Sequence, residues 1–363
     1  MYIRQADFEK GTNFIEQSLE LLSRLPQDAE RLLDEGWAYT RLGVVHTQQG
    51  NLEQAKSYFE QSLKLRAQAG DLVGVATLHN NLGYIAHHLQ GDLAAAIESY
   101  GRSLEVCRQI GYRYMMAMAS NNLGMAYQVS GNHQQAIACY QQSLQIRQEM
   151  GDLYGIASTY DNVGLAYHQR GDYEKAMEYH HLSLAIKREQ KDNFQIANSL
   201  INIAAVCCDQ ENYEEAVAFT EEASEIFQEI GGREYLAETY AVLASALLMT
   251  GERDLAHKYA ALALETAEET GNPKERARAA RVLGEVETLF DLDSAQDRLR
   301  RSVELLEKVG DRFELAKSLR SLARCLKLEG LETEGESCLT RAAQIFQDLD
   351  AQGELKKLVD SSY

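Results

Sequence analysis

Residues 152–191 read DLYGIASTYDNVGLAYHQRGDYEKAMEYHHLSLAIKREQK. The part up to Gln169 carries apolar and small residues three or four positions apart, which is the spacing of one face of an α-helix. Gly171 tolerates the left-handed backbone that ends a helix, and Asp172 can cap the next helix through its carboxylate. The remainder again has helical spacing, so the stretch predicts two helices joined by a short turn.

The same unit recurs eight times, about every 40 residues. Each copy has a Leu-Gly or similar dipeptide in its first half and two small residues, seven positions apart, in its second half. A fixed period in this range indicates stacked supersecondary units, which form a solenoid rather than a globule. The dipeptides are Leu42-Gly43, Leu82-Gly83, Leu123-Gly124, Val163-Gly164, Ile203-Ala204, Leu243-Ala244, Leu283-Gly284 and Leu322-Ala323.

This pattern resembles the tetratricopeptide repeat. The resemblance rests on the Leu-Gly dipeptide, a downstream Ala such as Ala55, an aromatic residue four positions later such as Phe59, and a later Ser or Ala such as Ser62. The usual closing proline is absent and the second helix is about two turns longer. That variant is similar to the repeats of Pins-type adaptors, kinesin light chains, MalT-like sensor arms and Gram-positive peptide-pheromone receptors.

The resemblance implies an all-α fold, a right-handed α-solenoid of stacked antiparallel helix pairs whose first helices line a concave groove. We expect an N-terminal helix at 1–29, either a native half-repeat cap or part of a segment cut from a larger protein. A C-terminal cap is expected at 350–363. Between them, at 30–349, the expected repeats are 30–70, 71–111, 112–151, 152–191, 192–231, 232–271, 272–310 and 311–349.

The formal net charge is −19 and the pI is about 5.0, which argues against general binding to nucleic acid or to an anionic membrane. The stretch 1–10 has no apolar signal-peptide core, and no apolar run is long enough to cross a membrane. The six cysteines follow neither a disulfide framework nor a zinc spacing. We therefore expect a reduced, cytoplasmic protein with no metal and no cofactor.

A set of asparagines falls where this family points side chains into the groove, two positions before the Leu-Gly glycine. An Asn amide has two donors and an acceptor, so it can bond both N–H and C=O of an extended peptide. The alternative is that these residues are inherited background, because Asn is common at this position in generic repeats. The candidate peptide-binding residues at this position are Asn81, Asn122, Asn162 and Asn202, and we add Asn80 and Asn121 one position earlier and Tyr84 directly after the glycine.

The charge distribution changes near the C-terminus. Residues 209–271 hold 15 acidic and 3 basic residues, whereas residues 272–330 hold 11 acidic and 13 basic residues. Arginine binds carboxylates and phosphates in a bidentate manner, so these cations are candidates for an acidic side chain, a phosphate or a terminal carboxylate. The alternative is pairing with nearby Glu285, Glu287 and Glu314. We call the candidate cations the basic patch: Arg278, Arg281, Lys317, Arg320, Arg324 and Lys327.

No phosphate-binding loop, zinc-binding helix or nucleophile elbow occurs, so we expect no enzyme. Our first hypothesis is a protein- or peptide-binding scaffold, a signalling adaptor that holds an extended, partly acidic segment. A second is the sensor arm of a larger signalling protein, such as a STAND-type ATPase or a transcription regulator. A peptide-pheromone receptor is third, because 1–29 is too short for a helical output module. A missing first helix would expose an apolar face that a homodimer through the terminal repeats would bury.

Overall fold

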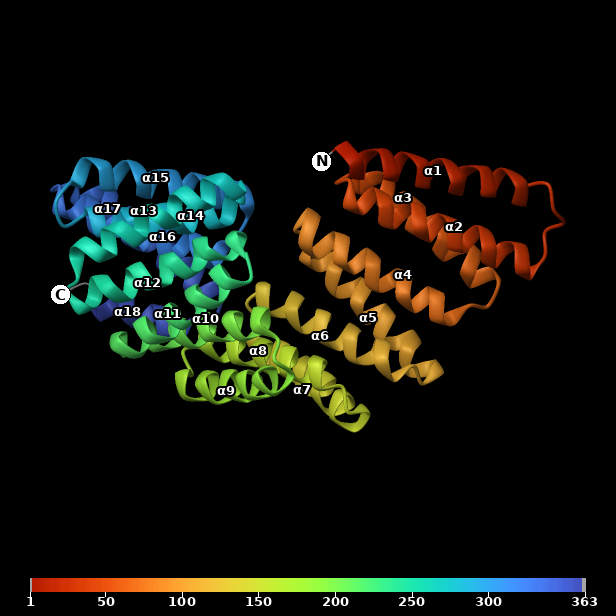
Figure 1. Ribbon diagram of the computed structural model, residues 1–363, viewed down its shortest axis with the longest axis horizontal. Helices are drawn as coiled ribbons and strands as arrows, with labels where there is room; N and C mark the ends of the chain where they lie inside the picture. The colour runs from red at the N-terminus through yellow and green to blue at the C-terminus, as the bar shows by residue number, and fades with distance from the viewer. Residues whose placement is uncertain (1, 361–363) are drawn as a thin grey trace. The chain divides into compact units, whose positions relative to one another are not determined.

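The structure, a computed structural model, describes residues 2–360, which contain helices and no strand (Figure 1). The expected all-α solenoid of helix pairs is confirmed. The first helices of the pairs are α2 (Ala29–Gln48), α4 (Leu72–Tyr84), α6 (Arg113–Val129), α8 (Leu153–Arg170), α10 (Asn193–Asp209), α12 (Leu236–Thr250), α14 (Pro273–Glu287) and α16 (Arg312–Leu328). Their partners are α3 (Leu52–Gln68), α5 (Leu93–Ile110), α7 (His133–Met150), α9 (Tyr173–Gln190), α11 (Tyr213–Glu229), α13 (Arg253–Thr270), α15 (Leu292–Val309) and α17 (Glu332–Asp348).

Four further elements flank or extend these pairs. Helix α1 (Tyr2–Leu22) precedes them and α18 (Gln352–Asp360) follows them. A π-helical segment η1 (Ile85–Gln90) continues α4, and a short 3-10 segment η2 (Arg233–Tyr235) leads into α12. The chain forms two compact units, one with α1 to α6 and most of α7, the other with α8 to α18. Each unit is described by itself below.

The turns within and between repeats use the residues that the sequence singled out. Gly171 has φ +85° at the end of α8, a left-handed conformation that favours glycine. The Asp172 carboxylate then accepts a hydrogen bond from the Lys175 amide, so one unsatisfied donor of α9 is bonded. Asp92, Asp152, Asp192 and Asp311 cap their helices in the same way.

The two helices of a pair approach closely at the glycine of the Leu-Gly dipeptide. A Cβ added at Gly83 would lie 2.7 Å from two ring carbons of Tyr100, and one at Gly124 would lie 2.6 Å from the Tyr140 ring. Gly164 meets the His180 ring in the same position, at 2.8 Å. The later small residue adds a hydrogen bond, because the buried Ser103 hydroxyl donates to the Ala76 carbonyl at 2.8 Å. Ser62, Ser143 and Ser302 make the equivalent bond.

The first helices also contact one another from repeat to repeat. In the second unit α10 packs on α8 and on α12, and α14 packs on α12 and on α16. Among the described residues, the second helices of this unit contact their counterparts far less. The more tightly packed layer of a curved stack is its inner layer, so the first helices form the inner wall, as the resemblance implied.

Replacing Gly124 with Ala tests the close approach. The added methyl group would collide with the ring of Tyr140, which is fully buried and whose hydroxyl donates to Gln128 at 2.7 Å. We expect the free energy of unfolding to fall by about 1–3 kcal/mol. Gly101→Ala in α5 is the matched control, because nothing lies within 4 Å of its Cβ. It should raise stability by up to about 1 kcal/mol in urea titrations followed by circular dichroism. Equal effects of the two changes would contradict this packing role.

Candidate functional site

The inner wall of the first unit brings three of the predicted asparagines together. Asn122 of α6 donates from Nδ2 to the Oδ1 of Asn80 in α4 at 3.0 Å. Asn80 is buried, while Asn81 and Asn122 are half-buried. One part of the predicted series is therefore a hydrogen-bonded pair that joins neighbouring first helices.

The two other candidates on α4 and α6 differ in exposure. Asn121 is only 8% exposed, and its Nδ2 lies 3.7 Å from the sulfur of Met125 on the same helix. Tyr84 is 45% exposed, which is high for an aromatic ring on an inner wall. Tyr84 is thus accessible to a ligand, and Asn121 belongs to the packing between helices.

In the second unit, Asn162 of α8 and Asn202 of α10 occupy the same register and are both half-buried. Within residues 2–360 the side chain of Asn202 makes no hydrogen bond. These two amides continue the predicted series on the inner wall of the second unit.

The neighbour of Asn162, Asp161, belongs to a buried polar cluster. Its carboxylate accepts from His180 Nδ1 at 3.2 Å and from the Ser199 hydroxyl at 3.3 Å, and it forms an ion pair with Lys187. Burial alone would raise the pKa of Asp161, but His180 and Lys187 hold it below its usual value. Burial lowers the pKa of His180, which keeps this imidazole neutral. The cluster satisfies its own charges and joins α8, α9 and α10.

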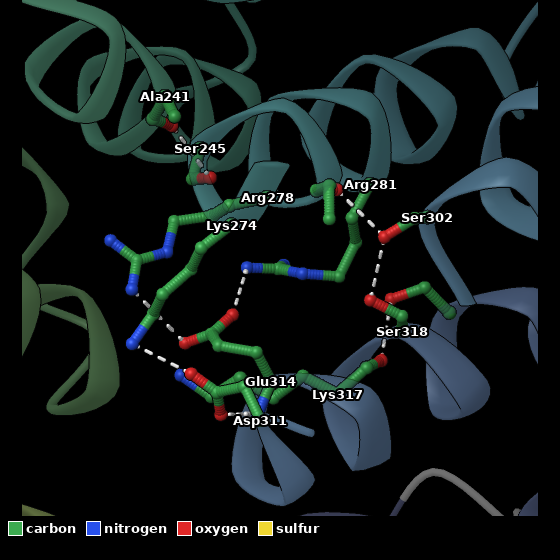
Figure 2. Close-up of polar contacts among 12 residues, drawn as sticks. Ala241, Ser245, Lys274, Arg278, Arg281, Ser302, Asp311, Glu314, Lys317 and Ser318 are labelled. Atoms are coloured by element: carbon green, nitrogen blue, oxygen red, sulfur yellow. Dashed lines mark hydrogen bonds and ion pairs between the residues drawn. The ribbon is translucent and has the colours of Figure 1, made fainter. Parts of the chain in front are cut away.

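Two arginines of the basic patch, Arg278 and Arg281, are paired within the protein. Figure 2 shows the guanidinium groups of Arg278 and Arg281, both from α14, converging on Glu314 of α16. The Nη2 atoms of Arg278 and Arg281 lie 3.7 Å and 3.4 Å from its carboxylate oxygens. Arg278 also pairs with Glu238, and Arg281 pairs with Glu285 at 2.9 Å. Two of the glutamates named in the alternative interpretation are thus the partners of these arginines.

Burial would raise the pKa of Glu314, but Arg278, Lys317 and Arg281 hold it far below its usual value. The third glutamate of the alternative, Glu287, pairs instead with Arg298 at 2.8 Å.

The remaining cations of the basic patch differ in exposure and in the groups that they contact, although their spacing in the sequence is regular. Arg324 is exposed, and Lys317 lies over the ring of Phe313 at 5.0 Å. The stem of Lys327 packs where a Cβ of Gly335 would lie, so this residue is on the side of α16 that faces α17. Lys327 is therefore placed between the helices of a pair and not beside Arg324 in a common patch.

The last candidate, Arg320, pairs with Glu354 of α18. On the same helix, Lys357 pairs with Asp209 of α10 at 2.6 Å, and Asp209 also bonds His168 at 2.7 Å. The sequence interpretation missed Asp209, Glu354 and Lys357. A signal was present, because Glu-Leu-Ala-Lys at 314–317 returns as Glu-Leu-Lys-Lys at 354–357. Residues 354–357 thus repeat the pattern of a first helix.

Three further observations concern cysteine reactivity, metal binding and membrane-spanning helices. Burial raises the pKa of Cys207 to about 11 and that of Cys208 to about 12, so both remain thiols at neutral pH and are poor nucleophiles. In the described part of the chain, no three His, Cys, Asp or Glu residues are grouped as a metal site would require. No helix described there combines the length and apolar composition needed to cross a membrane.

Comparisons with known proteins agree with this architecture. The family model described as tetratricopeptide repeat matches residues 34–109, 115–189 and 195–269. No curated protein sequence gives a match.

Several solved structures are similar in fold. A Rap protein complexed with Competence and Sporulation Factor has a TM-score of 0.69 at 14% identity, over 96% of this chain and 95% of that one. A Rap conjugation gene regulator in complex with a peptide has a TM-score of 0.65 at 14% identity, over 93% and 95%. A STAND protein with a tetratricopeptide repeat sensor, from Pyrococcus horikoshii, has a TM-score of 0.58 at 18% identity, over 93% of this chain and 50% of that one.

Glu314→Gln tests the ion pairs of Figure 2. The change removes a buried negative charge from between Arg278 and Arg281, so at pH 7 we expect the free energy of unfolding to fall by about 1–3 kcal/mol. The pKa of Glu314 is lower in the folded than in the unfolded protein, so its stabilising effect is complete above about pH 5 and is lost as the pH falls below that.

The difference between wild type and Glu314→Gln should therefore shrink from pH 5 to pH 3 in urea titrations. Glu222→Gln serves as the control, because Glu222 and Arg188 form an exposed pair. It should cost less than about 1 kcal/mol at any pH in this series. A pH-independent difference for Glu314→Gln would show that the carboxylate charge is not what stabilises the site.

Proposed function

Because this chain belongs to the tetratricopeptide repeat family, we propose that it is a non-enzymatic scaffold that binds an extended peptide segment of a partner protein along its first helices. The first helices form the inner wall of each unit and carry the half-buried amides at regular spacing. Repeat scaffolds present such walls as extended binding surfaces.

The observation that carries this proposal is the bond between Asn122 and Asn80. It holds one Nδ2 hydrogen of Asn122 and so fixes the orientation of the amide, while the Oδ1 of Asn122 accepts no hydrogen bond within the described residues. A fixed amide loses little conformational entropy on binding. Asn122 and the neighbouring Asn81 can then receive the N–H and C=O groups of an extended peptide, whatever its side chains.

In the second unit, Asn162 and Asn202 would hold the peptide backbone in the same manner. Within the described residues, three cations of the basic patch form no ion pair: Lys317, Arg324 and Lys327. Lys327 packs between α16 and α17, so Arg324 and Lys317 are the two that favour an acidic side chain in the partner. Arg278 and Arg281 act in this proposal as the support of the wall, because Glu238, Glu285 and Glu314 neutralise them.

Two further observations support the proposal. One of the structural neighbours was solved with a bound peptide. The six cysteines are free thiols, which suits a reducing compartment such as the cytoplasm.

A second candidate function is the sensor arm of a larger signalling protein. This candidate is supported by the similarity in fold to the STAND protein, because this chain covers only 50% of the length of that protein. The two candidates are separated by the mass of the native polypeptide in an immunoblot of the source cells. A stand-alone scaffold should migrate near 40.7 kDa, whereas a sensor arm should belong to a much heavier band.

The Asn series predicts a specific loss of affinity. Peptides selected from a random displayed library on the wild-type chain should bind Asn81→Ala/Asn122→Ala or Asn162→Ala/Asn202→Ala more weakly. Each lost amide contributes about 1 kcal/mol, so the Kd should rise about 30-fold in fluorescence anisotropy.

Asn212→Ala is the matched control, because Asn212 is exposed and makes no capping hydrogen bond from its side chain. Its Kd should equal that of the wild type. If the selected peptides bind both double variants as tightly as the control, with unchanged circular dichroism, the asparagines do not bind the peptide.

A further inference from the structure

The C-terminal helix α18 completes the inner wall of the second unit with charged contacts. Glu354 is only 4% exposed and pairs with Arg320 of α16. Three residues later, Lys357 pairs with Asp209 of α10 at 2.6 Å and lies over the ring of Tyr173 at 5.9 Å. One turn of α18 thus contacts α16 and also α9 and α10, which lie more than one hundred residues earlier in the chain.

The backbone of α18 also touches the turn between α8 and α9. A Cβ added at Gly171 would lie 2.8 Å from both N and Cα of Gly353, and one added at Gly353 would lie 3.0 Å from the Cα of Gly171. Only a pair of glycines allows this approach. Gly353 lies in the first turn of α18 and Lys357 in its last turn, and we call the glycine contact and the Lys357 ion pair together the latch.

The latch adds to the apolar packing of α18, in which Leu355 and Leu358 lie in the same core cluster as Leu349. With 9 residues, α18 is shorter than an isolated helix needs to be for stability in water. A cavity of about 740 Å³ borders it, lined by Asp172, Tyr173, Gln210, Asp350 and Gln352 among others.

We propose that α18 is a displaceable internal ligand of the second unit, and that an acidic residue of a bound peptide takes the place of Glu354 when the latch opens. Release of α18 removes Glu354 and Lys357 together. It leaves Arg320 without the carboxylate with which it forms an ion pair in the closed state. A half-buried guanidinium without its partner is unfavourable, so the vacated position attracts a carboxylate. This step rests on the proposed function and specifies the chemistry of the partner.

Hydrogen exchange tests the latch on the full chain. Gly171→Ala forces the turn away from Gly353, while Gly251→Ala places Ala at a similar φ, +89° against +85°, where nothing lies within 4 Å. Both variants therefore carry the same backbone strain. The amides of 352–358 should exchange about tenfold faster or more in Gly171→Ala, and as in wild type in Gly251→Ala. Equal exchange in the two variants would overturn the latch.

Binding in trans tests the carboxylate. The probe is a labelled synthetic peptide with the sequence of residues 349–358, LDAQGELKKL. It should bind Gly171→Ala at least about tenfold more tightly than wild type, where tethered α18 competes at high effective concentration. A peptide with Gln in place of Glu354 should lose about tenfold or more. Equal binding of the two peptides, or equal binding to both proteins, would overturn the proposal.

A failure of the internal-ligand proposal can be distinguished from a failure of the peptide-binding function itself. Selected peptides that depend on Asn162 and Asn202 of the second unit but leave exchange in α18 unchanged, even when they carry an acidic residue, would retain the scaffold and refute the internal ligand. An exchange effect in Gly171→Ala with no peptide binding to any variant would retain the contact at Gly171 and refute both binding proposals.

Discussion

The distance between the two helices of each pair is the constraint on which the other features depend. In the pairs that carry a glycine at this position, a ring or a branched side chain of the second helix lies directly against the backbone of the first, as Tyr100 does at Gly83 and Leu299 does at Gly284. This contact fixes the rotation of the first helix about its own axis. Residues 40 positions apart, such as Glu238 and Arg278, consequently face each other on the inner wall, and the surface chemistry follows from the packing.

The same logic explains which parts of the structure the sequence predicted. Periodicity identifies residues that share a register, because every repeat must place its apolar face in the same way. The helix pairs, the glycine turns and the first-helix series from Asn81 to Asn202 follow from it. Register alone does not say which partner a long side chain reaches. Arg281 bonds Glu285 one turn away and Glu314 on the next first helix, and either was compatible with its position.

Lys327 shows the second limit. It lies three residues after Arg324, yet its stem packs beside Gly335 while Arg324 is exposed. Positions three residues apart differ by about 60° around the helix axis, which here separates a side chain that packs against α17 from one that is exposed. The patch drawn from spacing combined residues of the inner wall with a residue between helices. Buried pairs such as Arg281–Glu314 are costly to desolvate and are weak evidence for added stability. Their better attested effect is to specify which helices associate, here α14 with α16.

Helix α18 is held in the second unit by apolar packing of Leu355 and Leu358 and also by polar contacts. Lys357 reaches Asp209, Glu354 reaches Arg320, and two glycines allow the backbones to touch. Apolar burial is nondirectional, whereas ion pairs of this kind depend on one partner charge at one position. In the proposed mechanism, a ligand that supplies a matching carboxylate therefore competes with Glu354 of α18 for Arg320.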